Sequence, residues 1–350
     1  MLRERPARRV APWIGLLLIA AAGCRGRPPA PPDPEPWHAW RRAHLAADGR
    51  VIDGGQGGIS HSEGQAYGML LATAWHDEAT FDRIWDWTRA HLAVRDDGLL
   101  AWRWEPGPDG GRITDRNNAT DGDLLAAWAL VRAARRFGRP ELLDAARALA
   151  RAVRRTVVRA SRHGPVLLPG AEGFVHDGQT TVNLSYWIFP ALSDLAAVDP
   201  DPAWQALDRS GRALVRACRF GEHGLPADWI TLADPPRPSR RFAPRFGYDA
   251  VRVPLYLAWS GRIDRPLFER LDAFWRAAGE RPPAWVDLVT GETGEPAPDG
   301  FLAVRGLVAR SLASPPADSA AEIPVPAGGG YYSDTLALLA LVAAHEAGGR

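Results

Sequence analysis

The strongest constraint on the fold of this chain is an alternation between two kinds of predicted helix. Charged, amphipathic patterns alternate with patterns that are almost free of charge, the first at 79–92, 140–157, 201–218 and 264–278, and the second at 63–75, 124–131, 182–193 and 250–259. An amphipathic helix covers a core with one face, whereas an uncharged helix is buried on every side. Outer and inner helices therefore alternate along the chain, as a toroidal helical barrel requires.

The number of helical patterns fits an all-α fold, an (α/α)6 barrel of paired outer and inner helices. Counting 37–47 as the first, we find about eleven, of which 299–312 and 332–344 are the last. Pro315-Pro316 lies between these two, where a further short outer helix is expected. Residues 99–114 alternate like a strand and contain a Pro-Asp-Gly-Gly turn, so a small β-hairpin is expected among the loops.

Residues 1–24 predict a targeting segment. A basic stretch precedes an apolar run over 10–22, which is too short to span a bilayer comfortably. The run ends in Ala-Ala-Gly followed by Cys24, which resembles a bacterial lipobox and makes Cys24 the candidate for lipidation. Cleavage as an ordinary secretory signal is the alternative. Both interpretations predict export, to the periplasm, to a membrane through an N-terminal lipid anchor, or out of the cell.

The remainder is expected to form a Pro-rich linker over 25–36 and a single domain over 37–350. The formal net charge is +1 and no basic stripe stands out, so nothing indicates a nucleic acid partner. The two cysteines, Cys24 and Cys218, can build neither a disulfide framework nor a zinc site, and Cys218 is left without an intramolecular partner. His61 has no second histidine at metal-binding spacing, and we expect no metal and no cofactor.

Acidic residues stand at the starts of three predicted inner helices. All inner helices of such a barrel run the same way, so their N-termini gather at one end. Glu63 begins the first of these helices, Asp121 and Asp123 precede the second, and Asp249 precedes the last. Each acid alone is explained as a cap, because a carboxylate suits the positive end of the helix dipole. Buried carboxylates from three helices around one mouth instead indicate a functional site.

Glu63 is the first candidate among these acids. Ser62 before it is a good N-cap, so a capping acid is the structural alternative. However, 65–75 is apolar or small all round, which places Glu63 at the mouth of a helix buried on every side. Partial desolvation raises the pKa of a carboxylic acid, as a general acid working near neutral pH requires.

The loops on this side of the predicted barrel supply aromatic rings. Trp102 and Trp104 share one face of the expected hairpin, while Tyr186 and Tyr248 stand at the starts of inner helices. Flat rings flanked by polar groups suit the faces of pyranose sugars, so these four are candidates for substrate binding. Loop packing is the alternative for each tryptophan. Three others lie within inner helices and are expected in the core: Trp75, Trp128 and Trp259.

Four segments together resemble glycoside hydrolase family 8, and within it the bacterial endoglucanases associated with cellulose synthesis. They are Ile-Ser-His-Ser-Glu-Gly-Gln-Ala-Tyr-Gly-Met at 59–69, Asn-Ala-Thr-Asp-Gly-Asp at 118–123, Pro-Ala-Asp-Trp at 226–229 and Tyr-Asp-Ala-Val-Arg at 248–252. Their order and wide spacing cover most of the chain after the targeting segment. Ala126 and Phe137 replace the isoleucine or methionine and the tryptophan that are usual in the second signature, which we interpret as packing changes.

The resemblance implies inverting chemistry in which Glu63 is the general acid, Asp249 the general base, and Asp121 the acid that binds the sugar at the cleavage point. Inversion requires two carboxyls roughly 6.5–9.5 Å apart, which acids on different inner helices can provide. Arg252 lies one turn beyond Asp249 and is expected to hold that carboxylate ionised, although an ordinary ion pair has the same spacing. Asp123 fits a capping or buried hydrogen-bonding role.

The resemblance thus implies an endo-acting β-1,4-glucanase with a cellulose-like polysaccharide as its partner. Two cellular roles fit this activity: a functional link to a cellulose synthase complex, and digestion of external polymer. The same scaffold acting on xylan, chitosan or mixed-linkage glucan is an alternative, because substrate choice lies in the loops. A non-catalytic glycan-binding lipoprotein is the alternative from another class, but binding alone does not require an acid and a base. Internal cleavage requires a groove open at both ends.

Overall fold

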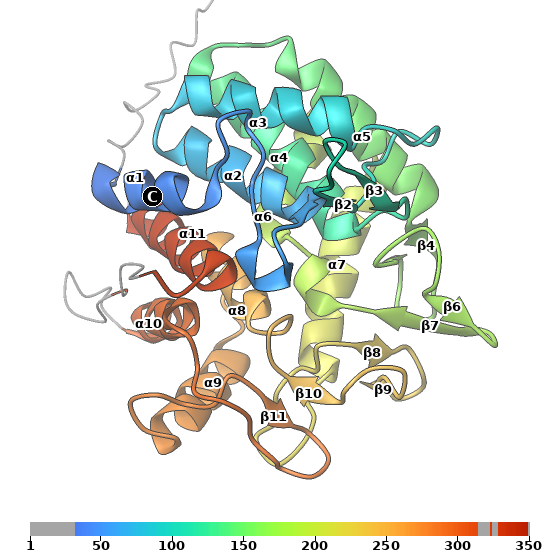
Figure 1. Ribbon diagram of the computed structural model, residues 1–350. Helices are drawn as coiled ribbons and strands as arrows, with labels where there is room; N and C mark the ends of the chain where they lie inside the picture. Colours follow the sequence, from blue (N-terminus) through green and yellow to red (C-terminus); the bar gives the residue numbers. More distant parts are fainter. Residues whose placement is uncertain (1–31, 314–322, 324–327, 349–350) are drawn as a thin grey trace, which may run out of the picture. The chain divides into compact units, whose positions relative to one another are not determined.

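Helices form the framework of the chain, which a computed structural model describes over residues 32–313, 323 and 328–348. This part contains eleven α-helices (Figure 1). In chain order they are α1 (Pro34–His44), α2 (Ser62–Ala74), α3 (Glu78–His91), α4 (Thr120–Phe137), α5 (Leu142–Thr156), α6 (Phe189–Val198), α7 (Pro202–Ala217), α8 (Arg252–Trp259), α9 (Arg265–Ala277), α10 (Asp299–Leu312) and α11 (Tyr331–Gly348).

The inner helices of the described chain close into a ring. Helix α2 packs on α4, α4 on α6, α6 on α8, α8 on α10 and α11, and α11 packs back on α2. The outer helices α3, α5, α7 and α9 pack against α2, α4, α6 and α10, and α1 packs against α11. The predicted (α/α)6 barrel is therefore confirmed. The further helix expected near Pro315-Pro316 lies outside the described residues.

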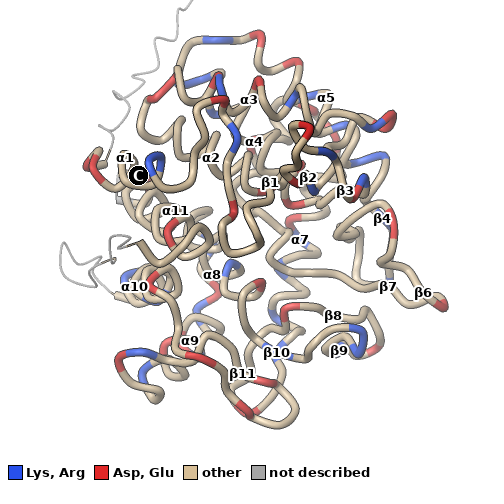
Figure 2. Tube along the Cα trace, viewed as in Figure 1, with Lys and Arg blue, Asp and Glu red and all other residues tan. Residues whose placement is uncertain are grey.

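Charge patterning explains which helices lie inside. Every residue of α2 from Gly64 to Ala74 is buried, so this helix has no face that can carry a charge. In the outer helix α5, by contrast, Leu142, Ala146, Leu149 and Val153 are buried at helical spacing, while arginines occupy the other face. Figure 2 shows the result, with charged residues along the outer helices and loops and few along α2. Trp75, Trp128 and Trp259 lie in the core, as predicted.

Helix α1 begins inside the segment that was expected to be a linker up to residue 36. Asp33 is its N-cap and accepts a hydrogen bond from the Glu35 N–H at 3.0 Å. Pro34 occupies the first helical position, where a missing N–H leaves no hydrogen bond unmade. Trp37 then stacks on Trp75, with ring centroids 6.0 Å apart. Pro-rich composition therefore predicted the end of the linker a few residues too late.

Two predictions concern the targeting segment and the cysteines. The segment over 1–24, including Cys24, lies outside the described residues. None of the helices that the structure describes has both the length and the apolar character needed to cross a membrane. Cys218, at the end of α7, is buried and forms no disulfide, and burial raises the pKa of its thiol to about 12.

Short strands are confined to the loops between helices. The predicted hairpin is present as β2 (Arg103–Glu105) and β3 (Arg112–Asp115), and β1 (Ser60–His61) adds an antiparallel third strand that leads directly into α2. The other strands were not predicted, since two to four residues are too few to show alternation. They form a β4-β5 pair, a β6-β7-β8-β9 sheet and a β10-β11 pair: β4 (Val158–Arg159), β5 (Val166–Leu167), β6 (Val175–His176), β7 (Gln179–Val182), β8 (Ile230–Thr231), β9 (Arg237–Pro238), β10 (Arg245–Phe246) and β11 (Val286–Asp287).

Two inner helices begin later than the sequence pattern predicted. The segment expected to be helical from 182 starts with a 3-10 turn at Leu184–Tyr186, and α6 begins only at Phe189. Pro190 explains the break, because a proline is tolerated in the first helical turn but not in a helix interior. Likewise α8 begins at Arg252, which leaves Asp249 in the turn that precedes it. The residues before both helices are therefore loop residues at the barrel mouth.

Candidate active site

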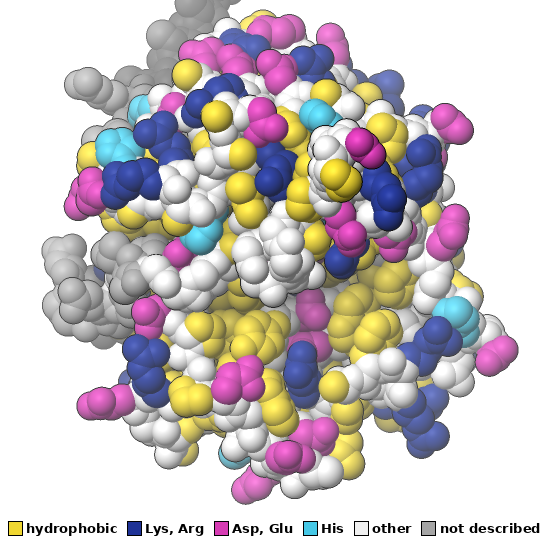
Figure 3. Space-filling view, viewed as in Figure 1, with side chains coloured by type: hydrophobic (Ala, Val, Ile, Leu, Met, Phe, Trp, Pro, Cys, Tyr) yellow, Lys and Arg dark blue, Asp and Glu magenta, His cyan; other side chains and the backbone are white. Residues whose placement is uncertain are grey.

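A groove crosses the face of the domain near the starts of α2 and α8. Figure 3 shows it as a hollow with acidic side chains at its floor and hydrophobic side chains on both walls. One part of the groove is a cleft of about 360 Å³. This cleft is lined by Asp53, Gly55, Gln56, His61, Glu63, Tyr248, Asp249, Arg252, Tyr331 and Tyr332. Both acids predicted to perform the chemistry therefore face one cavity.

Glu63 is held at the cleft by the entry of the chain into α2. The Ser62 N–H donates to the Trp102 carbonyl at 3.0 Å, which fixes the start of the helix against the β2 strand. The N-cap is His61 and not Ser62, because the His61 Nδ1 accepts the Gly64 N–H at 3.0 Å. The Glu63 side chain is only 17% exposed, as the prediction of a partly desolvated carboxyl requires.

Asp121 lies beside Glu63 because α2 and α4 approach each other closely at their first turns. A Cβ atom on Gly122 would lie 2.2 Å from the Ser62 Oγ, so only glycine permits this crossing. The Asp121 carboxyl is buried, and its Oδ1 accepts the Gly122 N–H at 2.9 Å. Burial raises the pKa of Asp121 to about 7.

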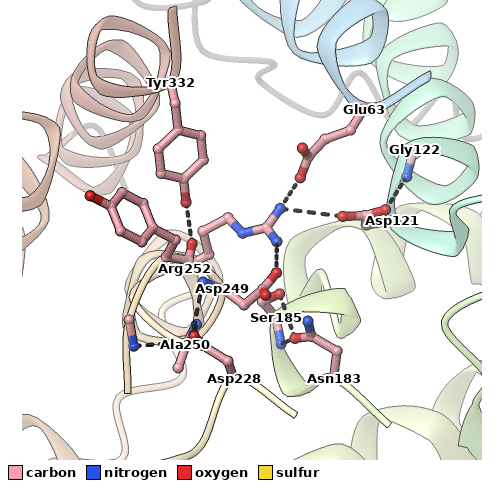
Figure 4. A network of polar contacts seen from close by, with 12 residues as sticks. Glu63, Asp121, Gly122, Asn183, Ser185, Asp228, Asp249, Ala250, Arg252 and Tyr332 are labelled. Carbon is pink, nitrogen blue, oxygen red and sulfur yellow. Dashed lines mark hydrogen bonds and ion pairs between the residues drawn. The ribbon is translucent and has the colours of Figure 1, made fainter. Parts of the chain in front are cut away.

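One guanidinium joins the three predicted acids (Figure 4). Arg252 Nη1 contacts Glu63 Oε1 and lies 3.2 Å from Asp121 Oδ2, while Nη2 lies 2.7 Å from Asp249 Oδ1. The Arg252 side chain is 5% exposed, so these contacts are shielded from solvent. The acids come from segments far apart in the sequence, and the structure brings all three together as the inner-helix pattern predicted.

The turn that carries Asp249 is organised by Asp228, a residue of the Pro-Ala-Asp-Trp segment. Asp228 Oδ1 accepts hydrogen bonds from the backbone N–H groups of Gly247 at 3.0 Å, Asp249 at 3.2 Å and Ala250 at 2.8 Å. Asp228 is 2% exposed, and Arg245 Nε lies 3.3 Å from its Oδ2. The motif predicted that this acid matters, but not that it fixes the backbone beneath Asp249.

The electrostatics of Asp249 differ from the prediction in one respect. Its contact with Arg252 is present, but burial raises the pKa of the Asp249 carboxyl well above its usual range, and the nearby Asp228 charge raises it further. The Asn183 side chain and Arg245 act in the opposite direction. Arg252 alone therefore does not fix the charge of Asp249, because the surroundings of the carboxyl favour its protonated form.

Tyrosines that the sequence analysis did not single out support the acids. Tyr67 OH donates to Glu63 Oε1 at 3.2 Å and lies 2.7 Å from Tyr256 OH. Tyr67 lies four residues beyond Glu63, and this one-turn helical spacing is the signal that indicates the contact. Tyr332 OH donates to the Tyr248 carbonyl and so supports the opposite side of the cleft.

The two predicted tyrosines lie at the site. Tyr248 OH donates to Glu295 Oε1 at 2.5 Å. Burial raises the pKa of Tyr248 to about 12, and the contact with Glu295 acts in the same direction. The Arg252 guanidinium carbon lies 6.0 Å from the centroid of the Tyr186 ring. Tyr248 lines the cleft, and the Tyr186 ring lies next to the guanidinium that joins the three acids.

The two tryptophans of the hairpin separate in the structure. Trp104 is 6% exposed, and its ring packs edge-on against Trp87 with centroids 5.4 Å apart, so it has no free face for a sugar. The prediction that Trp104 stacks on substrate is corrected for this reason. Trp102 lies just before β2 and is only partly buried. A register shift between Arg103 and Trp104 breaks the simple alternation on which the prediction depended.

A second aromatic cluster near the site was not predicted. Trp229 stacks on Phe242 with centroids 4.3 Å apart and on Phe174 with centroids 5.7 Å apart. Tyr186 meets the Trp229 ring edge-on at 6.2 Å. Phe242 is 37% exposed, which is unusual for a ring of this size. The only sequence signal was Trp229 itself, the last residue of the Pro-Ala-Asp-Trp segment.

Asp123 has the structural role that was predicted. Its Oδ1 accepts the Leu100 N–H at 2.8 Å, and its Oδ2 accepts the Asn118 Nδ2–H at 2.8 Å. The side chain is fully buried, and burial raises its pKa to about 7. Within the described ranges, no group of three His, Cys, Asp or Glu side chains is arranged to hold a metal ion.

Fold and site together define a class of protein. A ring of inner helices presents paired carboxyls at the floor of a surface groove with aromatic walls, which is the arrangement of a glycoside hydrolase that cleaves polysaccharides. The model of the glycosyl hydrolases family 8 matches residues 9–346 of this chain. The chain therefore belongs to glycosyl hydrolase family 8, as the sequence motifs indicated.

Individual relatives agree with this assignment. The chain is 37% identical over 338 residues to a probable endoglucanase of Novacetimonas hansenii, covering 95% of this chain and 96% of the relative. It is 35% identical to an endoglucanase of Cellulomonas uda, covering 81% of this chain and 82% of the relative. Among solved structures, the endo-β-1,4-glucanase of Acetobacter xylinum superposes with a TM-score of 0.82 at 38% identity, covering 90% of this chain and 98% of that one.

Proposed function

We propose that this chain is an endo-acting β-1,4-glucanase that hydrolyses internal bonds of a cellulose-like polysaccharide with inversion. The observation that carries the proposal is the convergence of Glu63 and Asp249 on Arg252 at the floor of a groove. The endoglucanase relatives, which align over nearly the whole chain, support the substrate class.

In this proposal Glu63 donates its proton to the glycosidic oxygen as the bond to the anomeric carbon breaks. Asp249 removes a proton from a water molecule that attacks the same carbon from the opposite side. The two carboxyls come from different inner helices and contact different terminal nitrogens of Arg252, so the guanidinium separates them. Such a separation gives space for a water, which direct contact between the carboxyls would exclude.

Asp121 and the aromatic rings hold the sugar at the point of cleavage. Asp121 is buried next to Glu63 and reaches Arg252, so it can accept a hydroxyl hydrogen bond from the sugar that is attacked. Tyr248 lines the cleft together with Asp249, the Tyr186 ring lies next to Arg252, and Trp102 is the remaining candidate from the hairpin. Each favourable ring contact contributes about 0.5–1.5 kcal/mol beyond area burial.

The alternative substrates and the non-catalytic alternative make different demands on the site. Xylan, chitosan or mixed-linkage glucan would use the same acid and base, so only activity measurements separate them. A glycan-binding lipoprotein would need aromatic rings but no buried acid–base pair. The presence of both Glu63 and Asp249 in one cleft therefore favours an enzyme.

The direct test incubates purified protein with carboxymethylcellulose, xylan and chitosan and measures new reducing ends together with viscosity. An endo-glucanase should lower the viscosity of carboxymethylcellulose early in the reaction. Glu63→Gln and Asp249→Asn should each lose activity by about a hundredfold or more, because each removes a proton transfer and little packing. Asp144→Asn removes an 85% exposed carboxylate and serves as the control. Activity of either site variant within about tenfold of wild type would refute these roles.

The cellular role is part of the same proposal. An exported enzyme held to a membrane by Cys24 would act on glucan in the cell envelope, either beside a cellulose synthase complex or on external polymer. The Cys24→Ala variant should then move from the membrane fraction to the soluble fraction. If wild-type protein is already soluble after export, the lipid anchor is excluded and ordinary signal cleavage is favoured.

A further inference from the structure

The β6-β7-β8-β9 sheet is anchored at the active site by its two central strands. β7 runs directly into Asn183, whose side chain lies beside the Asp249 carboxyl (Figure 4). β8 begins at Ile230, two residues after Asp228, which accepts the backbone N–H of Asp249 at 3.2 Å. Both strands therefore meet the turn that carries Asp249 at one end, and the rest of the sheet extends away from it.

One face of this sheet carries a row of polar and aromatic side chains. Thr181 pairs with Thr231, and Thr231 pairs with Arg237, so these three side chains lie on the same face. Trp229 lies two residues before Thr231, and its carbonyl continues the ladder by accepting the Ser239 N–H at 2.8 Å. Side chains two apart in a strand point to the same face, so the indole shares the surface that carries Arg237.

The aromatic part of this face leads back to the acids. Phe242 stacks on Trp229, and Tyr186 meets the Trp229 ring edge-on. The Tyr186 ring lies 6.0 Å from the guanidinium carbon of Arg252, which contacts all three acids. Phe242 at the other end of the row is exposed. A sugar chain that leaves the acids along these rings would therefore be carried toward the outer part of the sheet.

Beyond the rings the same face forms a positively charged pocket. The pocket has a volume of about 220 Å³ and is lined by His176, Asp177, Gln179, Thr181, Thr231, Arg237, Arg240 and Arg241. Three of these side chains are arginines and only one is an acid, so positive charge is in excess.

Two of the arginines have no partner that neutralises them. Arg237 Nη2 donates to Gln179 Oε1 at 3.2 Å. Within the part of the chain that the structure describes, by contrast, no ion pair or hydrogen bond holds the guanidinium of Arg240 or of Arg241. Both side chains are exposed. They are therefore available to an anionic ligand.

The pocket is separated from the acids by enough strand to receive a different sugar unit from the one that is attacked. Gln179 and Asn183 are four residues apart along extended chain, which spans about 13 Å. Arg241, which lines the pocket, directly precedes the exposed ring of Phe242. A cation and an aromatic ring thus stand next to each other at the surface.

We propose that this pocket binds an anionic substituent, a carboxylate or a phosphate ester, on a glucosyl unit that lies along the aromatic row. The inference rests on the proposed function and names a substrate class within it, a β-1,4-glucan with acidic substituents. Guanidinium groups bind carboxylate and phosphate oxygens through charge-assisted hydrogen bonds. An unsubstituted glucan chain carries no charge, so it gains nothing from these contacts.

The test compares an anionic and a neutral soluble cellulose. Carboxymethylcellulose carries carboxylates, whereas hydroxyethylcellulose does not. The double variant Arg240→Gln/Arg241→Gln should lower kcat/KM for carboxymethylcellulose by about three- to tenfold, because two exposed ion pairs are lost. It should keep kcat/KM for hydroxyethylcellulose within about twofold of wild type. Added sodium chloride should reduce the difference on carboxymethylcellulose, because salt screens exposed charges.

A matched control removes the same charge elsewhere on the surface. Arg155 on α5 and Arg209 on α7 are exposed residues of outer helices. Arg155→Gln/Arg209→Gln should change kcat/KM by less than about twofold on both polymers, which separates the pocket from a general attraction between charges. All four arginines are exposed, so both double variants should have a Tm close to that of wild type.

Binding gives a second measurement that does not depend on hydrolysis. In the Glu63→Gln background the polymer stays intact, and isothermal titration calorimetry gives the apparent Kd for each polymer. Adding Arg240→Gln/Arg241→Gln should raise the Kd for carboxymethylcellulose by a factor similar to the loss in kcat/KM. The Kd for hydroxyethylcellulose should stay within about twofold.

The outcomes separate the anionic site from the proposed function. Equal losses on both polymers, no loss on either, or the same loss in the control variant would overturn the anionic site. A rise in wild-type Tm with inorganic phosphate, without any selective effect on carboxymethylcellulose, would also overturn it, since the pocket would then hold a free anion. Wild-type protein that hydrolyses neither polymer would instead contradict the proposed function, and the calorimetric comparison would still decide whether the pocket recognises charge.

Discussion

Arg252 Nη2 lies 2.7 Å from Asp249 Oδ1, yet the pKa of this carboxyl is raised above its usual range. Burial is the main cause, and the Asp228 charge acts in the same direction. A general base must be ionised to accept a proton, so a raised pKa restricts the pH range in which the enzyme works. A raised pKa also makes the carboxylate a better proton acceptor near neutral pH.

The acid limb of the pH dependence should therefore lie above the usual pKa of an aspartic acid, about 3.9. Activity requires ionised Asp249 and should fall as the pH drops through its raised pKa. Asp228→Asn should move this limb of kcat/KM to lower pH, because it removes a negative charge. Arg245→Met should move it to higher pH, because Arg245 lowers the pKa of Asp249. Shifts in the same direction for both variants would exclude Asp249 as the group responsible.

Burial of Asp123 should make the folded state less stable as the pH rises. Its pKa in the folded chain is about 7, whereas it titrates near 3.8 when unfolded. The stabilisation that protonated Asp123 gives to the folded state is fully present below about pH 3.8 and is lost as the pH rises through about 7. Over this range the free energy of unfolding falls by at most about 1.4 kcal/mol per pH unit. Asparagine mimics the protonated acid, so Asp123→Asn should show a smaller fall in Tm between pH 4.5 and 8. An unchanged slope would show that other groups cause the fall.

The hairpin tryptophans should respond differently to removal. Trp104→Ala deletes a buried ring that packs on Trp87 and should lower the free energy of unfolding by about 3–5 kcal/mol. Trp102→Ala should leave stability nearly unchanged and raise KM several-fold for long oligosaccharides, with less effect on short ones. Melting curves and a series of cello-oligosaccharides measure both effects. If Trp102→Ala shows no dependence on length, the sugar contacts lie elsewhere, and the Trp229 cluster is the next candidate.

Much of the fold and of the site was readable from the order of residue types. A helix without charges, such as α2, can only be buried, and a ring of inner helices that run the same way must bring Glu63, Asp121 and Asp249 to one end. Helical spacing likewise predicted the contact between Asp249 and Arg252. These predictions succeeded because each depends on burial or on a local repeat.

The features that were missed depend on contacts between distant segments. Asp228 acts through three backbone N–H groups of a loop about twenty residues away, and no local pattern encodes that contact. The position of the Asn183 side chain beside Asp249 is likewise visible only once the fold is known. Trp104 was misplaced because a register shift beside it breaks the alternation of the strand. Sequence thus predicted which residues gather, and the structure was needed to assign what each one touches.

The stereochemistry of cleavage tests the central claim most directly. If Glu63 and Asp249 act on opposite sides of the anomeric carbon with a water between, a β-1,4 linkage must yield a product that is first formed as the α-anomer. Proton NMR of cellohexaose during the first minutes of hydrolysis distinguishes the two anomers before they equilibrate. The account predicts that the α-anomeric signal of new reducing ends appears first. Initial formation of the β-anomer would contradict inversion by this pair of acids, and intact cellohexaose would contradict the glucanase assignment.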